Sequence, residues 1–128
     1  MRDLLADVLG HLQANAPLVA VVGGRIYAGT ATPPNSYKPT QGACIVFDFR
    51  GGQPAYEGME RPRLQTKTYG LTPYVAQAGY RALVDALHEV QGGNVRWAKL
   101  STYGQNLLEP ETDWHFVLAF FELMIRSE

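Results

Sequence analysis

The sequence predicts an α+β fold in which a mostly antiparallel sheet of about four to five strands is packed by two main helices. Three observations predict it: apolar residues recur at helical spacing in 2–14 and 72–90, shorter segments alternate as strands do, and a long segment, 114–126, is almost wholly apolar. The expected order is helix, strand, strand, strand, helix, strand, strand. Because helices interrupt a mostly antiparallel sheet, this order favours an α+β layer in one domain, residues 1–128, over a doubly wound parallel sheet.

The N-terminal part is expected to contain one amphipathic helix and one ambiguous segment. Residues 18–22 fit either a short helix or a strand. Pro17 before them and Gly23 after them favour a helix, because proline suits a first helical turn and glycine suits a helix end. A short strand is expected over 25–27. The stripe of the first helix consists of Leu5, Val8, Leu9 and Leu12.

Two loops and two strands are predicted in the middle of the chain. Residues 30–42 contain Pro33, Pro34 and Pro39, a composition that interrupts regular elements. A strand over 43–50, a glycine-containing loop over 50–60 and a strand over 61–69 follow. In the first of these strands, Ile45, Phe47 and Phe49 share one face, and Cys44, Val46 and Asp48 share the other. In the second, Leu64, Thr66 and Thr68 share one face, while Arg63, Gln65, Lys67 and Tyr69 are expected to face solvent or a lumen.

The next helix is predicted to begin at Thr72-Pro73, an N-cap followed by proline in the first turn, and to end at Gly92-Gly93. A strand over 95–101 and a polar loop over 102–113 lead to the last strand. The stripe of this helix consists of Ala76, Gly79, Tyr80, Leu83, Ala86, Leu87 and Val90.

The last strand, 114–126, is apolar on both faces. Successive side chains of a strand point to opposite sides of a sheet, and a small antiparallel sheet usually exposes one side to water. This strand therefore requires two covers: the protein's own helix and, we expect, a neighbouring copy. One face carries Phe116, Leu118, Phe120 and Met124; the other carries Val117, Ala119, Phe121, Leu123 and Ile125.

Composition excludes several classes of protein. Of the 128 residues, 46% are hydrophobic and 18% are charged, which is typical of a globular protein. A formal net charge of −1 argues against a dedicated nucleic-acid binder. Cys44 is the single cysteine and is expected to be a buried residue. The chain lacks a secretory signal pattern and any apolar run of membrane-spanning length, so we expect a soluble, intracellular protein without membrane contact.

No catalytic motif is evident, and neither an enzyme nor a bound metal or cofactor is expected. His11, His88 and His115 are not spaced as metal ligands. Glu109, Glu111 and Asp113 crowd one segment without the oxygen spacing of a calcium loop. They are expected to form a solvated acidic turn, with pairing between subunits as the next interpretation.

Several segments resemble the tail-completion proteins of long-tailed phages, prophages and gene transfer agents, also called tail terminators or head–tail joining proteins. The distinctive segments are Val22-Gly23-Gly24-Arg25-Ile26-Tyr27 and Glu109-Pro110-Glu111-Thr112 before the last strand. The strand at 61–65, the helix at 80–87 and the apolar last strand follow in the family's order. The likeness covers nearly the whole chain.

This resemblance implies a structural protein of the virion tail–neck region, present in the host bacterial cytoplasm during assembly. Such a protein forms a ring, commonly of six copies, which caps the tail tube, ends its polymerisation and presents a surface to the neck. The implied partners are therefore other copies of the chain, the tube protein, a neck or head-closure protein, and DNA only in passing through the lumen.

Candidate surfaces follow from the pattern. The expected subunit interface consists of Phe116, Leu118, Phe120, Phe121 and Leu123, and the expected docking residues in the two loops are Pro33, Pro34, Tyr37, Tyr56 and Met59. The alternative for both loops is that they are merely flexible. A head-side neck or adaptor subunit is an alternative. A second alternative is a small dimeric α+β domain that binds a ligand or catalyses a reaction between sheet and helix, near Tyr80, His88 and His115.

Overall fold

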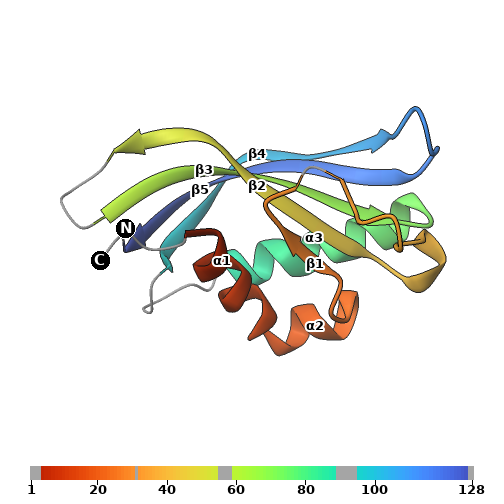
Figure 1. The fold of residues 1–128 in the computed structure, drawn as a ribbon, viewed down its shortest axis with the longest axis horizontal. Coiled ribbons are helices and arrows are strands. Elements are labelled where there is room, and N and C mark those ends of the chain that lie inside the picture. The colour runs from red at the N-terminus through yellow and green to blue at the C-terminus, as the bar shows by residue number, and fades with distance from the viewer. Residues whose placement is uncertain (1–3, 31, 55–58, 89–94, 127–128) are drawn as a thin grey trace.

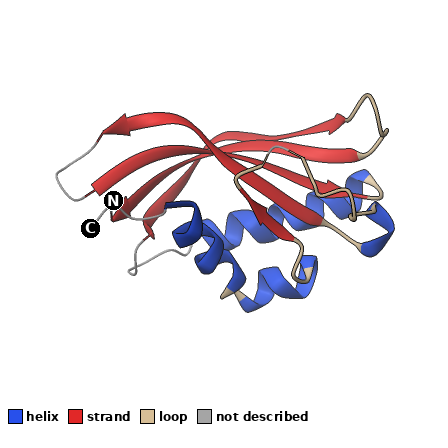
Figure 2. Cartoon of the chain, viewed as in Figure 1, coloured by secondary structure: helices blue, strands red, loops and turns tan. Residues whose placement is uncertain are grey.

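The computed structural model describes residues 4–30, 32–54, 59–88 and 95–126, and they form an α+β fold as predicted. Three helices lie on one face of a five-stranded sheet (Figures 1 and 2). The strand order is β1-β2-β3-β5-β4; β1 pairs parallel to β2 and the other neighbours pair antiparallel. The sheet is therefore mixed through its short first strand.

The first helix, α1 (Leu4–Gln13), confirms the predicted stripe by burying Val8 and Leu12. The ambiguous segment is a helix, α2 (Ala16–Val22). Its N-cap is Asn15, whose side-chain oxygen accepts a hydrogen bond from the Leu18 backbone at 3.0 Å. The strand β1 (Ile26–Ala28) follows, and the next loop contains a short 3₁₀ helix, Pro39–Gln41.

The central hairpin is longer than predicted. β2 spans Cys44–Pro54 and β3 spans Met59–Gly70, so the loop expected over 50–60 is wrong for 50–54 and 59–60. The register shifts between Phe49 and Gly52, where Gly52 has a φ of 133°. Glycine tolerates this conformation, and the strand continues through the bulge.

The longest helix, α3 (Pro73–His88), begins as predicted, with the Thr72 hydroxyl accepting a hydrogen bond from the Val75 backbone at 3.2 Å. Its expected last turn and glycine end, 89–93, lie outside the described residues.

β4 spans Val95–Leu108 and β5 spans His115–Arg126. The loop expected over 102–113 is therefore wrong for 102–108. Residues 102–108 pair with β5 after two register shifts, between Leu100 and Thr102 and between Thr102 and Gln105, which an edge strand can accommodate because only one side is held by a neighbour.

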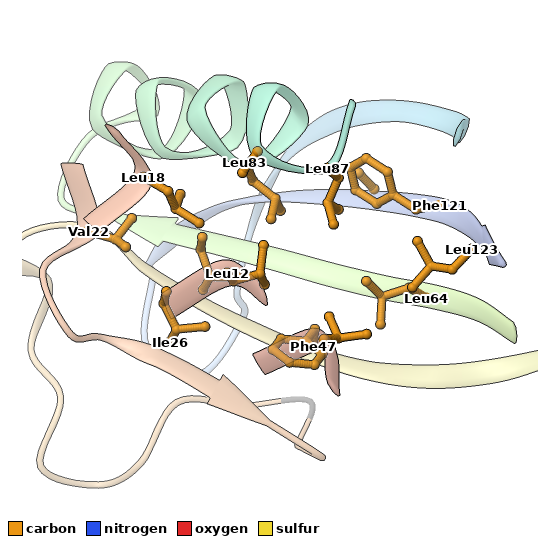
Figure 3. Packing of buried hydrophobic residues seen from close by; sticks show 14 of the residues in the cluster. Leu12, Leu18, Val22, Ile26, Phe47, Leu64, Leu83, Leu87, Phe121 and Leu123 are labelled. Atoms are coloured by element: carbon orange, nitrogen blue, oxygen red, sulfur yellow. The ribbon is translucent and has the colours of Figure 1, made fainter. Parts of the chain in front are cut away.

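The main core lies between the helices and the sheet (Figure 3). The three α-helices and the strands β1, β2, β3 and β5 contribute buried residues to it, and Ala98 and Leu100 of β4 pack against it. Its members include Leu12, Leu18, Val22, Ile26, Phe47, Leu64, Leu83, Leu87, Phe121 and Leu123.

Candidate functional site

The two faces of β5 meet different surroundings. On the helix side, Phe121 is 2% exposed and Leu123 is 0% exposed, and both point into the core beneath α3 (Figure 3). They are therefore unavailable to another subunit, and their assignment to the expected interface is corrected. The protein's own helices cover this face, as was predicted for one of the two apolar faces of the last strand.

The opposite face of β5 is covered in part by the protein's own 30–42 loop. Tyr37 from this loop packs edge-on against Trp114, with ring centroids 5.6 Å apart. Tyr69 stacks on Phe116 at 5.2 Å, and only 8% of Phe116 is exposed. This end of the face therefore has its second cover within one chain, where a neighbouring copy was expected. The cluster consists of Tyr37, Cys44, Val46, Tyr69 and Phe116.

This second cluster corrects two predictions. Tyr37 is 1% exposed and its hydroxyl donates to the Gly42 carbonyl at 2.7 Å, so it holds the loop down and does not present a docking side chain. Tyr69 is fully buried, although its strand alternation predicted solvent or a lumen. The alternation is right, but the loop covers this end of the face.

The other predicted docking residues lie in different places. Pro33 and Pro34 are half-buried and line a shallow hollow of about 390 Å³ on the loop. Met59 opens β3 opposite Arg126, and Tyr56 lies outside the described residues.

The rest of the second face remains accessible; we call Arg61, Arg63, Gln65, Leu118, Phe120 and Glu122 the open sheet face. Leu118 and Phe120, two of the expected interface residues, are half-buried here. The Arg63 guanidinium carbon lies 4.2 Å from the centre of the Phe120 ring. Arg61 pairs with Glu122 at 3.9 Å, and a hollow of about 180 Å³ lies between Gly52, Arg61, Arg63 and Glu122.

Three exposed apolar side chains lie on the edge strand β4. The sequence pattern did not predict them as surface residues of a strand. Tyr103 is 83% exposed, Leu107 is 38% exposed and Leu108 is 51% exposed. Their signal in the sequence was the adjacent leucine pair at 107–108 in an otherwise polar run. Because that run was assigned to a loop, its apolar residues were not placed on a sheet edge.

The acidic turn lies between β4 and β5. Glu111 and Asp113 are exposed, and the Asp113 backbone donates to the Glu109 carbonyl at 2.8 Å. Glu109 is half-buried and faces inward: its Oε2 and the Tyr69 hydroxyl are both buried without a hydrogen-bond partner in the described part of the chain. Burial raises the pKa of Tyr69, and the nearby Glu109 carboxylate raises it further.

Cys44 is a buried residue. Burial raises the pKa of its thiol from 9.0 to about 12, so the thiol is protonated at neutral pH. Within the described ranges, no three histidine, cysteine, aspartate or glutamate side chains are grouped as they would be to hold a metal ion.

The residues proposed for a ligand site between sheet and helix have other roles or positions. The Tyr80 hydroxyl accepts a hydrogen bond from the Gly104 backbone at 2.9 Å and ties α3 to β4. His115 is half-buried at the start of β5, and His88 ends α3 with its side chain outside the described part. A cavity of about 10 Å³ lies between α3 and the sheet, and its lining in the described part of the chain is apolar: Val84, Leu87, Ala98, Leu100 and Phe121.

His11 joins two helices, because its Nε2 lies 3.0 Å from the Ala86 carbonyl. In the described residues, no single helix is long and apolar enough to cross a membrane; α1 and α2 would reach that length only together, and they are bent by 85°.

Comparison with known proteins gives a likeness of fold. No protein-family model matches this chain, and no curated protein matches it significantly. Among solved structures, it is similar to a chain of the "Virion of native gene transfer agent (GTA) particle", with a TM-score of 0.64 and 16% sequence identity. The match covers 96% of this chain and 94% of that chain. At this identity, the likeness shows a shared fold along nearly the whole length.

Proposed function

We propose that this protein is a structural virion subunit that caps the tail tube as an oligomeric ring, ends tail polymerisation and forms the tail-side surface of the head–tail joint. The observation that carries the proposal is the end-to-end fold likeness to a chain of a gene transfer agent virion. The tail-completion-like segments at 22–27 and 109–112 support the tail role within that particle.

The surface of the protein is consistent with an assembly role. The open sheet face carries half-buried Leu118 and Phe120 beside arginines, and the edge strand β4 exposes Tyr103 and Leu108. Exposed apolar side chains next to charged ones are typical of interaction surfaces. The partners in this proposal are other copies of the chain, the tail tube protein and a neck protein, with DNA passing through the ring at ejection.

Deletion of the gene, followed by electron microscopy of the particles, tests the proposal. Loss of a tail terminator leaves tube polymerisation unchecked, so tails of variable and excessive length are expected, and the wild-type gene supplied in trans should restore the normal length. Normal tails on heads that lose their DNA would instead favour the head-side neck role. Normal, infectious or transfer-competent particles would overturn both roles.

Light scattering on the purified protein measures ring formation independently. A mass that rises with protein concentration to a fixed multiple of the mass of one chain is the expected result. Negative-stain images of the same sample would then give the number of copies.

A further inference from the structure

The hollow on the open sheet face has the chemistry of a carboxylate site. Among the described residues that line it are two arginines, Arg61 and Arg63, and one carboxylate, Glu122. Arg63 is exposed, and its guanidinium carbon lies 4.2 Å from the centre of the Phe120 ring, which favours this position of the side chain. A planar guanidinium held in this way can bind a carboxylate through two parallel hydrogen bonds.

The same chain carries a matching acidic element. In the acidic turn, residues 109–114, Glu111 and Asp113 are exposed. The turn is held by backbone hydrogen bonds from Asp113 to Glu109 at 2.8 Å and from Glu109 to Trp114 at 2.9 Å. Leu107 and Leu108 are exposed at its base and would add apolar area to any contact.

These two elements lie at opposite ends of the sheet. The acidic turn forms the tip of the β4–β5 hairpin, whereas the hollow lies toward the β2–β3 hairpin (Figure 1). Glu122 lies eight positions after Trp114 along the chain, which is roughly 26 Å of extended strand. Within one chain, the turn therefore cannot reach the hollow.

We infer that the acidic turn of one copy docks in the hollow of the next copy, with Glu111 against Arg63. This inference rests on the proposed ring, for which it supplies the contact between subunits. The occupant is a second copy because one chain carries both elements: arginines line the hollow, and exposed carboxylates lie on the acidic turn. A contact between two different patches is head-to-tail, and such contacts close into a ring when the rotation between copies permits.

Variants in which one charge of the contact is reversed test this inference. Their self-association is measured by sedimentation velocity on the full chain at low salt. Arg63→Glu and Glu111→Arg should each weaken self-association by about tenfold or more, because each places like charges against one another. Combining both reversals in one chain should restore most of the affinity, and added salt should weaken the wild-type association. Arg63→Gln is a second variant, since glutamate at 63 would also lie opposite Glu122 and could affect folding.

Arg81→Glu and Asp85→Lys are matched controls, because both residues are exposed on α3 away from the sheet. They should leave the association constant unchanged. If Arg63→Glu and Glu111→Arg behave like these controls while the wild type still forms rings, the contact is wrong and the ring proposal stands. A wild-type chain that is monomeric at millimolar concentration also overturns the contact, and tail length in the deletion strain still decides the proposed function.

Discussion

Two buried tyrosines in the cluster beneath the 30–42 loop differ in the hydrogen bonding of their hydroxyl groups. The Tyr37 hydroxyl donates to the Gly42 carbonyl at 2.7 Å, whereas the Tyr69 hydroxyl is buried without a hydrogen-bond partner in the described part of the chain. Tyr37→Phe should therefore lower the free energy of unfolding by about 1 kcal/mol, and Tyr69→Phe should lower it less, because the Tyr69 hydroxyl has only a longer contact with the Glu109 carboxylate. Urea unfolding followed by circular dichroism measures both, and an equal loss in the two variants would contradict this reading.

The same cluster predicts that stability falls at alkaline pH. Burial raises the pKa of Cys44 from 9.0 to about 12 and raises the pKa of Tyr37 and of Tyr69 above 10.0. Between pH 9 and 10 the unfolded thiol loses its proton while the folded thiol keeps it. Since the unfolded state then binds fewer protons, the free energy of unfolding should fall with a slope approaching about 1.4 kcal/mol per pH unit.

Cys44→Ala is the control for this pH dependence. It should reduce the slope near pH 9, where the unfolded tyrosines, with an ordinary pKa of 10.0, still hold most of their protons, and leave the tyrosine-driven decline near pH 10 and above in place. Urea titrations at fixed pH values give the curve. An unchanged slope in Cys44→Ala would show that another group causes the decline.

At the scale of the elements, two glycines in helices have opposite surroundings. A Cβ at Gly10 in α1 would meet no atom within 4 Å, whereas a Cβ at Gly79 in α3 would lie 2.7 Å from Thr68 Cγ2. Gly10→Ala should therefore raise the free energy of unfolding by about 0.5–1 kcal/mol through helix propensity. Gly79→Ala should lower it by about 1–3 kcal/mol, because overpacking separates α3 from the sheet. Thermal and urea unfolding of the pair measure this, and a gain at Gly79 would show that the interface adjusts freely.

The helices and strand faces could be predicted because their signals are local. The stripe of α1, the capped start of α3 and the alternation in β2 each reflect a single element facing one core. The C-terminal half of β4 could not be predicted in this way. Its pairing depends on β5, and its glycine and polar residues fit two register shifts that only the partner strand reveals.

Part of the candidate surface could be predicted, because the alternation of side chains along a strand is a local signal. Alternation placed Phe116, Leu118 and Phe120 on one face correctly, but it could not tell which end of that face a distant loop would cover. Tyr37 reaches Trp114 across 77 residues of sequence, a contact that no local pattern contains. Phe121 and Leu123 were included because both faces of β5 are apolar, and only the helix packing assigns them to the core.

At the scale of the whole molecule, the covering of the sheet is uneven. Helices cover one face completely enough to bury Phe121 and Leu123, and the 30–42 loop covers one end of the other face. The uncovered remainder lies next to Arg61, Arg63 and Glu122, and the exposed side chains of β4 border the acidic turn. The accessible apolar residues therefore lie beside complementary charges at the two ends of the molecule, as a head-to-tail assembly requires.

The chain should also unfold as a single unit. Its main core takes buried residues from the three α-helices and from β1, β2, β3 and β5, and β4 packs against it, so no helix–sheet subset has a separate interior. Under dilute conditions where the protein is monomeric, circular dichroism and tryptophan fluorescence should report one shared urea midpoint. Leu83→Ala, at the centre of α3, should lower the free energy of unfolding by about 2–5 kcal/mol without changing the slope with urea, because one core loses a buried side chain. If the helical signal were lost before the fluorescence signal, the N-terminal helices and the sheet would be separate cooperative units, and the single-domain prediction would be wrong.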